Sequence, residues 1–241
     1  MNVRLFTLPN LLTLANLLAG SAAVIVILTT HSYQTALWLI VAAAVCDFFD
    51  GFVARLLGQI SPLGVQLDSL ADDISFGLVP AVAMFDIYRR SESMYSLPEH
   101  IAEPLGYLTL IIAAFSALRL AKFNIDSTQS AEFSGLPTPA NALMLMSLAV
   151  LMEQGRVVLT QEYVLLISVA AAMLLISPIR MFALKFKGFG LRGNELRYGF
   201  ILVSLLLIIF CTTYSLLAIV VLYIAVSTLR WLFTAKSDTN K

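Results

Sequence analysis

Eight apolar runs of helix length follow one another along this 241-residue chain, and they constrain its fold more than any other feature. A membrane-spanning helix needs about 20 predominantly apolar residues to cross roughly 30 Å of hydrocarbon. The runs lie near residues 11–30, 34–57, 63–88, 101–122, 137–153, 161–185, 196–210 and 213–234. The mean hydropathy of +0.88 and the 59% share of hydrophobic residues also indicate an integral membrane protein, with no room for a separate soluble domain.

Helices explain these runs better than strands, because barrel strands would be about half as long and would alternate in polarity. We therefore expect an all-α, polytopic membrane bundle of about eight transmembrane helices in a single domain, residues 1–241. The last two runs meet at residues 211–214, which would form either a tight hairpin or one bent pair. The count is thus seven or eight, and we favour eight. The run at 161–185 is expected to be one continuous span.

Charge is balanced overall but unevenly distributed along the chain. Fifteen Lys and Arg match fifteen Asp and Glu, which excludes a nucleic-acid binder with a basic surface. If the N-terminus is cytoplasmic, twelve of the fifteen basic residues fall on inner loops and only Arg89, Arg90 and Arg156 on outer ones. We expect a bacterial-type inner membrane protein with a cytoplasmic N-terminus, and we interpret residues 1–10 as a retained interfacial segment rather than a signal peptide.

Aspartates interrupt the apolar pattern at the end of the second run and the start of the third. Asp47 and Asp50 are one helical turn apart, as are Asp68 and Asp72, so each pair shares a helix face. The loop near residue 61 is short, so the two helices must be antiparallel neighbours. The sequence therefore predicts that four carboxylates converge near the cytoplasmic boundary.

Bare carboxylates in such a place repel one another, and each costs about 2.5–3.5 kcal/mol at the bilayer centre on insertion scales. Carboxylate oxygens suit Mg²⁺, Mn²⁺ or Ca²⁺, and four of them can hold two ions about 3.5–4 Å apart, as in phosphoryl transfer. The alternative is that these aspartates only cap helix ends. Asp73 lies off the shared face, and we expect it to be solvated rather than functional.

The spacing of these residues resembles the signature of the CDP-alcohol phosphatidyltransferases, with every signature position present. The eight positions are Asp47, Asp50, Gly51, Ala54, Arg55, Gly64, Asp68 and Asp72. The resemblance implies a core of six helices, often dimeric, with the remaining helices from about residue 196 as accessory elements. It also implies an enzyme at the cytoplasmic face, in which an alcohol attacks a CDP-activated lipid and CMP leaves.

The resemblance further assigns roles within the segment 47–72. Asp47, Asp50, Asp68 and Asp72 would hold two ions of Mg²⁺ or Mn²⁺, and Asp72 would also be the general base. By the same resemblance Asp47, Gly51 and Ala54 would border the cytidine. From their chemistry and position we expect further residues to bind the CDP-lipid: Asn10, Thr13, Arg55 and Gly64. Ordinary alternatives exist for helix capping by Asn10, close helix packing by Gly51 and Ala54, and interfacial placement of Arg55.

Five further segments resemble the branch of this family that uses L-serine as the acceptor alcohol. They are residues 8–13, 68–81, 119–124, 135–140 and 177–187. Serine is zwitterionic, so its pocket needs a donor for the carboxylate and acceptors for the ammonium. Ser75, Arg119 and Asn124 are the serine-binding candidates, whereas Lys122 could equally end its span at the lipid headgroups. The expected partners are CDP-diacylglycerol, L-serine, the product CMP, membrane lipids and a second copy in a homodimer.

Two alternatives remain open from the sequence. The same chemistry could serve another acceptor, such as glycerol 3-phosphate or inositol, although a phosphorylated acceptor would need more basic residues beside Asp72. A protein of another class, a cation transporter, could use the four carboxylates as its ion site. Such a transporter predicts an inverted repeat, which the sequence lacks.

Overall fold

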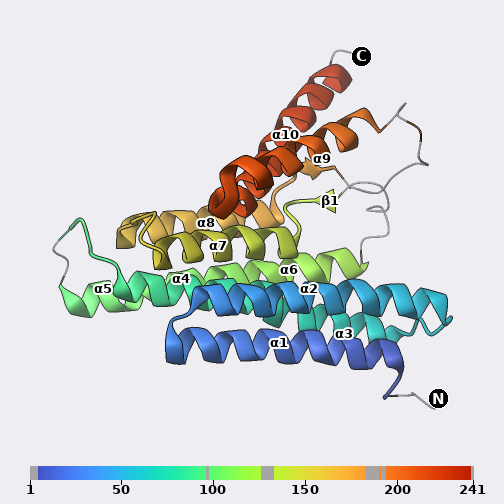
Figure 1. Ribbon diagram of the computed structural model, residues 1–241, viewed down its shortest axis with the longest axis horizontal. Coiled ribbons are helices and arrows are strands. Elements are labelled where there is room, and N and C mark those ends of the chain that lie inside the picture. The colour runs from blue at the N-terminus through green and yellow to red at the C-terminus, as the bar shows by residue number, and fades with distance from the viewer. Residues whose placement is uncertain (1–4, 96–97, 126–132, 183–189, 191–193, 240–241) are drawn as a thin grey trace.

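Figure 1 shows a computed structural model of the chain, which describes residues 5–95, 98–125, 133–182, 190 and 194–239. Eight helical segments follow the eight predicted apolar runs, so the expected all-α polytopic membrane bundle is confirmed. They are α1 (Leu8–Thr30), α2 (Tyr33–Leu56), α3 (Pro62–Asp72) continued by the π-helix η1 (Asp73–Leu78) and α4 (Val79–Arg90), α5 (Glu99–Leu105) continued by the 3₁₀-helix η2 (Gly106–Leu110) and α6 (Ile111–Ile125), α7 (Thr138–Glu153), α8 (Gln161–Ile176), α9 (Glu195–Cys211), and α10 (Ser215–Thr239).

Side-chain caps set the beginnings of the first helices. The Thr7 hydroxyl accepts a hydrogen bond from the backbone N–H of Asn10, and Pro9 occupies the first turn, where its missing N–H costs nothing. Helix α1 therefore begins at Leu8, three residues before the predicted start. Ser32 and Ser61 cap α2 and α3 in the same way, which fixes the short connection between the two aspartate-bearing helices.

Small residues bring the first helices into close contact. Ala23, Ala36 and Ala43 are all completely buried, and α1 packs along α2 over most of its length. Small side chains at such positions allow the close backbone approach that drives helix association in lipid. Among the described residues, the segments 8–30, 33–56, 99–125 and 195–233 are long and apolar enough to cross a membrane, and α7 and α8 are shorter apolar helices.

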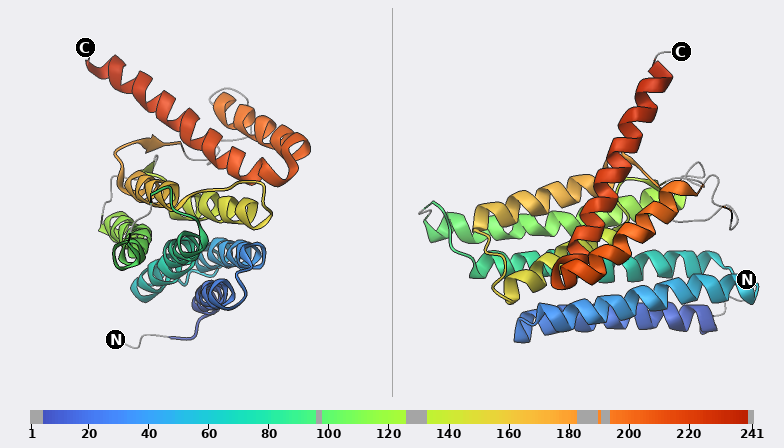
Figure 2. Two further views of the ribbon diagram at one scale, coloured as in Figure 1. Left: turned by 90° about the vertical axis from the view of Figure 1, so that its left-hand side faces the viewer. Right: turned by 45° about the horizontal axis from the view of Figure 1, so that its top comes forward.

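The last two helices form a hairpin, as the favoured sequence interpretation predicts. Thr212 adopts a left-handed φ of 38° within the short 3₁₀-turn η3 (Thr212–Tyr214) that joins them. Helix α10 packs against α7 and continues past it, inclined to the rest of the bundle (Figure 2). The hairpin therefore forms an outer layer and adds nothing to the packing between α1 and α3.

The predicted continuous span at 161–185 is wrong at its C-terminal end. Helix α8 ends at Ile176, because Pro178 has no backbone N–H and disfavours helical backbone before it. The chain continues as strand β2 (Arg180–Met181), which pairs antiparallel with β1 (Phe133–Ser134). The sequence prediction contained no strand here. Residues 183–189 and 191–193, which include the basic residues Lys185, Lys187 and Arg192, lie outside the described part of the chain.

Gly135 joins β1 to the turn before α7 and closes this small sheet onto α8. Its φ is +80°, its N–H donates to the carbonyl of Ile179, and a Cβ here would lie only 2.2 Å from the Leu175 carbonyl oxygen. Both the backbone conformation and the available space therefore require glycine.

Gly135→Ala should lower the thermal unfolding midpoint of the detergent-purified protein by about 5 °C or more, because it adds backbone strain and a steric clash. Gly199→Ala is the matched control, since no atom lies within 4 Å of a Cβ at that helical position. Unfolding followed by intrinsic fluorescence would compare the two. Equal midpoints for both variants would contradict the structure around Gly135.

Candidate functional site

Three carboxylates meet where the C-terminal part of α2 faces α3. Asp47 and Asp50 lie on the last turns of α2, and Asp68 lies on the second half of α3. One oxygen from each lies within 4.8 Å of the others. The short loop at residues 57–61 makes the two helices antiparallel neighbours. The aspartates of α2 therefore lie opposite Asp68 of α3.

The surroundings of these carboxylates fit a bound divalent cation. Asp50 is only 5% exposed, and Asp68 has a buried Oδ1 with no hydrogen-bond partner. No Lys or Arg nitrogen in the described residues forms an ion pair with Asp47, Asp50 or Asp68. An unpartnered carboxylate oxygen in an all-oxygen donor set is what Mg²⁺, Mn²⁺ or Ca²⁺ requires.

Asp72 lies one turn beyond Asp68 on α3. It is 9% exposed and is more buried than Asp68. Asp47, Asp68 and Asp50 are its acidic neighbours. The side-chain amide of Asn16 on α1 donates to Asp72 Oδ1 at 3.0 Å. The structure thus brings all four aspartates together, with Asp72 at the edge of the three-carboxylate group.

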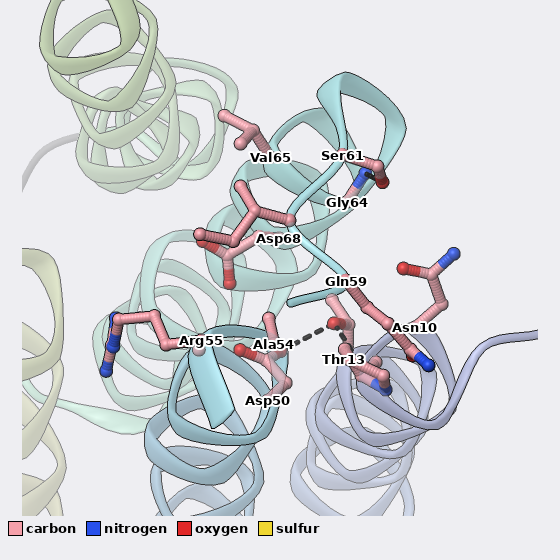
Figure 3. A pocket seen from close by; sticks show the side chains of 13 residues that line it. Asn10, Thr13, Asp50, Ala54, Arg55, Gln59, Ser61, Gly64, Val65 and Asp68 are labelled. Carbon is pink, nitrogen blue, oxygen red and sulfur yellow. Dashed lines mark hydrogen bonds between the residues drawn. The ribbon is translucent and has the colours of Figure 1, made fainter. Parts of the chain in front are cut away.

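A cavity of about 250 Å³ opens beside the cluster between α1, α2 and α3 (Figure 3). Most of the residues expected to bind the nucleotide line it, whereas Asp47 does not. The lining residues from that set are Asn10, Thr13, Gly51, Ala54, Arg55 and Gly64. Asp50 and Asp68 also line this cavity, so the carboxylates and the expected nucleotide-binding residues border one space.

Individual side chains in the cavity are held in place by neighbours. The Thr13 hydroxyl donates to Asp50 Oδ2 at 2.5 Å, and the Asn10 amide donates to the carbonyl of Leu5 at 2.8 Å. Figure 3 shows Arg55 extending to the opposite side from Asn10. Within 4 Å, a Cβ on Gly51 would meet only the Arg55 guanidinium, so the backbone at Gly51 is open to a ligand.

Several cavity residues were missed by the sequence analysis. Gln59, Ile60 and Ser61 come from the loop between α2 and α3, and Val65 and Pro9 complete the wall. The signature spacing passes over the loop positions, and no periodic pattern marks them. The one available signal was the short length of the loop, which forces its residues to lie beside the carboxylates.

The three candidates for serine binding are not grouped around one point. The Ser75 side chain is completely buried, and its hydroxyl donates to the backbone carbonyl of Asn16 at 3.0 Å. The amide of Asn124 donates to the Ser69 hydroxyl at 2.8 Å on the exposed side of α3 and α6. Arg119 is partly buried, its Nε has no hydrogen-bond partner among the described residues, and Asp72 is among its charged neighbours.

Arg119 also lines a second cavity of about 290 Å³ between α6 and α8. Lys122, Ser134 and the end of α8 complete its wall. Two cationic side chains and a hydroxyl make this the most suitable place in the described residues for a small anionic group near Asp72.

Asp73 does not point into solvent as expected. It begins the π-helix η1, is half-buried, and faces α6: a Cβ on Gly77 would lie within 3 Å of both Asp73 Oδ1 and Ser116 Oγ. The absence of a side chain at Gly77 therefore lets η1 pack directly against α6, with Asp73 between them.

Comparison with known proteins places this arrangement in one family. The family model for CDP-alcohol phosphatidyltransferases matches residues 6–177, which include the carboxylate cluster and the cavity. The chain therefore belongs to the CDP-alcohol phosphatidyltransferase family. Helices α9 and α10 lie beyond the matched region.

Relatives in this family span bacteria of different groups. A Helicobacter pylori protein is 29% identical over 238 residues, covering 95% of this chain and 92% of its own. A Mycobacterium leprae protein is 37% identical over 74% of this chain and 59% of its own, and a Bacillus subtilis protein is 32% identical over 59% and 75%. All three are named CDP-diacylglycerol–serine O-phosphatidyltransferase.

The Thr13–Asp50 hydrogen bond generates a prediction about metal affinity. Thr13→Val keeps the side-chain shape but removes the donor that orients Asp50, so Mn²⁺ should bind about 10-fold more weakly. Electron paramagnetic resonance of free Mn²⁺ would measure this in detergent-purified protein. Thr29→Val is the control, because that hydroxyl bonds only to the Ile25 carbonyl of its own helix. Unchanged affinity in Thr13→Val would show that Asp50 needs no such support.

Proposed function

We propose that this membrane enzyme transfers the phosphatidyl group of CDP-diacylglycerol to the hydroxyl of L-serine, giving phosphatidylserine and CMP. The observation that carries the proposal is the four-aspartate cluster beside the cavity, in a chain whose relatives share this one activity name. The cation-transporter alternative is not carried forward, because the chain belongs to a transferase family.

Asp47, Asp50 and Asp68 are the residues that would hold the divalent metal, with Asp72 contributing from the edge of the cluster. When bound, Mg²⁺ or Mn²⁺, as two ions, would neutralise charge on the diphosphate. The positive charge of the metal would offset the repulsion among the carboxylates. The cluster could then bind a phosphate group, which the bare carboxylates would repel.

The first cavity suits the CDP group. Arg55 provides a cation for the diphosphate, while Gly51, Ala54 and Gly64 keep the walls clear of side chains. Asn10 and Thr13 present polar groups on the opposite wall. The diacylglycerol chains of the lipid can remain among the surrounding apolar helices while the nucleotide occupies this cavity.

Asp72 is the proposed general base. Its carboxylate accepts the proton of the serine hydroxyl as the serine oxygen bonds to the phosphorus that carries diacylglycerol. The bond from that phosphorus to the bridging oxygen breaks, and CMP leaves with the bond's electron pair. Direct displacement is favoured, since none of the described Ser, Cys or His residues at the cluster is paired with a base as an activated nucleophile.

The acceptor site is proposed at Arg119. Arg119 lines the 290 Å³ cavity and is close enough to Asp72 for their charges to interact, so we propose that it holds the serine carboxylate while the hydroxyl reaches the base. Ser75 and Asn124 hold neighbouring parts of the chain in this structure, which favours a supporting role for them over direct binding.

The cellular arrangement is proposed from charge and topology. Arg55, Arg119, Lys122 and Arg180 belong to the end of the bundle that carries the carboxylates, whereas Arg89 and Arg90 lie at the far end of α4 (Figure 1). By the positive-inside rule, the active-site end and the N-terminus face the cytoplasm of a bacterial-type inner membrane. We expect a single domain, residues 1–241, with accessory α9 and α10, assembled as a homodimer.

The first test is CMP release by the detergent-purified enzyme with CDP-diacylglycerol and Mn²⁺ or Mg²⁺. Serine should support release, glycerol 3-phosphate and inositol should not, and chelation should abolish it. Asp72→Asn should reduce the rate by at least about 10³-fold if this carboxylate is the base and also stabilises the site. Release with another alcohol alone would keep the chemistry but overturn the choice of serine.

Arg119→Gln should raise the KM for serine by about 10-fold or more, because it removes a charged donor from a carboxylate. The KM for CDP-diacylglycerol should stay unchanged. Lys122→Gln is the matched control, with a smaller effect expected because Lys122 is exposed. A fall in kcat at constant serine KM would contradict the assignment of Arg119 to the acceptor.

A further inference from the structure

Helix α1 presents a polar stripe toward the carboxylate cluster, and no metal-binding or nucleotide-binding assignment accounts for its centre. Thr13, Asn16 and Gly20 follow at spacings of three and four residues, so they share one face of the helix. Thr13 contacts Asp50, and Gly20 contacts the segment after Asp72. Asn16 lies between them and is completely buried.

Asn16 makes a direct contact with the proposed base. Its Nδ2 donates to Asp72 Oδ1 at 3.0 Å, which occupies one of the two carboxylate oxygens. Of the two ends of the amide only the NH₂ group can donate to a carboxylate, so it faces Asp72 and the amide oxygen, Oδ1, does not make this contact. That oxygen is buried and has no hydrogen-bond partner among the described residues. The hydrogen bond to Asp72 is therefore made at the cost of an unsatisfied buried acceptor.

The backbone carbonyl of Asn16 is also bonded to the segment that follows Asp72. The Ser75 hydroxyl, one turn further along η1, donates to the Asn16 carbonyl at 3.0 Å. Gly20 lets α1 come this close, because a Cβ there would lie 2.8 Å from the Ser75 Cα. Asn16 is therefore held at two points, its side chain and its backbone carbonyl, against the segment that carries Asp72.

We propose that Asn16 is a positioning residue that orients the Asp72 carboxylate for proton abstraction from the acceptor hydroxyl. The proposal rests on the function proposed above. By holding Oδ1, Asn16 leaves Oδ2 as the oxygen directed at the acceptor. Small misplacements of a reacting group lower the rate strongly, and partners that orient a functional carboxylate typically contribute about 10- to 100-fold to activity.

The test compares Asn16→Leu, which keeps a similar branched shape without a donor, with Asn16→Gln, which keeps the amide on a longer chain. Asn16→Leu should lower kcat by about 10- to 100-fold, with the KM values for serine and CDP-diacylglycerol changed less than about threefold. Asn16→Gln should recover part of the loss. Ser21→Ala is the control on the same helix, because its hydroxyl bonds only to the Leu17 carbonyl.

Two further measurements separate positioning from folding and from metal loss. Asn16→Leu should bind Mn²⁺ with affinity within about threefold of the wild type, whereas a metal ligand variant, Asp50→Asn, should bind more weakly by at least about 10-fold. The infrared carboxylate band of Asp72, identified with isotope-labelled aspartate and Asp72→Asn, should shift in Asn16→Leu.

A kcat within twofold of the wild type, a loss confined to KM, or an unshifted Asp72 band would each overturn the proposal. If wild-type enzyme released no CMP with serine, the proposed acceptor would fail instead. The comparison of kcat would then use the alcohol that does support release. The infrared measurement requires no turnover, so it distinguishes a wrong assignment of Asn16 from a wrong choice of substrate.

Discussion

Electrostatic repulsion among four aspartates inside an apolar bundle is the constraint on which the rest of this structure depends. A single ionised side chain already costs several kcal/mol at the bilayer centre, and three of these oxygens lie within 4.8 Å of one another. Such a cluster is tolerable only near the membrane boundary and with cations at hand. The first condition is met because the aspartates occupy the last turns of α2 and the body of α3, beside a cavity. The second is met when a divalent metal binds between them.

Helix α1 gives the cluster its fixed geometry. Because α2 and α3 are joined by only a short loop, they are neighbours by connectivity, but a loop alone does not fix the separation of Asp50 from Asp72. Thr13 bonds to Asp50 and Asn16 bonds to Asp72 from the same face of a third helix. Two contacts one turn apart on a rigid helix set that separation, and Gly20 permits the close approach on which both contacts rely.

The sequence predicted the helices well because lipid leaves few choices. Apolar runs of spanning length must become helices, so seven of the eight segments lie close to their predicted positions and the eighth, 161–185, ends early at Ile176. The signature spacing predicted the meeting of Asp47, Asp50 and Asp68, because helical periodicity and one short loop suffice to bring them together. The strands β1 and β2 were missed, since two-residue strands carry no periodic pattern.

The remaining differences arise where a neighbouring helix decides what a side chain contacts. The spacing from Asp72 predicts that Ser75 lies one turn further along the same face, and it does, but α1 covers that face and the Ser75 hydroxyl donates to the Asn16 carbonyl. Asp73 faces α6 rather than solvent, because Gly77 lets η1 pack directly against that helix. Asn16 was missed for another reason: a single amide in an apolar run gives no signal until the helix opposite is known.

Different helices form the two proposed binding sites, one for the CDP-lipid and one for the acceptor alcohol. The carboxylates and the first cavity, proposed for the nucleotide, lie between α1, α2 and α3, whereas the second cavity, proposed for the acceptor, lies between α6 and α8 and is lined by Arg119. On this proposal, one group of helices binds the CDP-lipid and another binds the acceptor alcohol. Substitutions around Arg119 can alter the charge and shape presented to the alcohol without disturbing the carboxylates, which is how one signature can serve several acceptors.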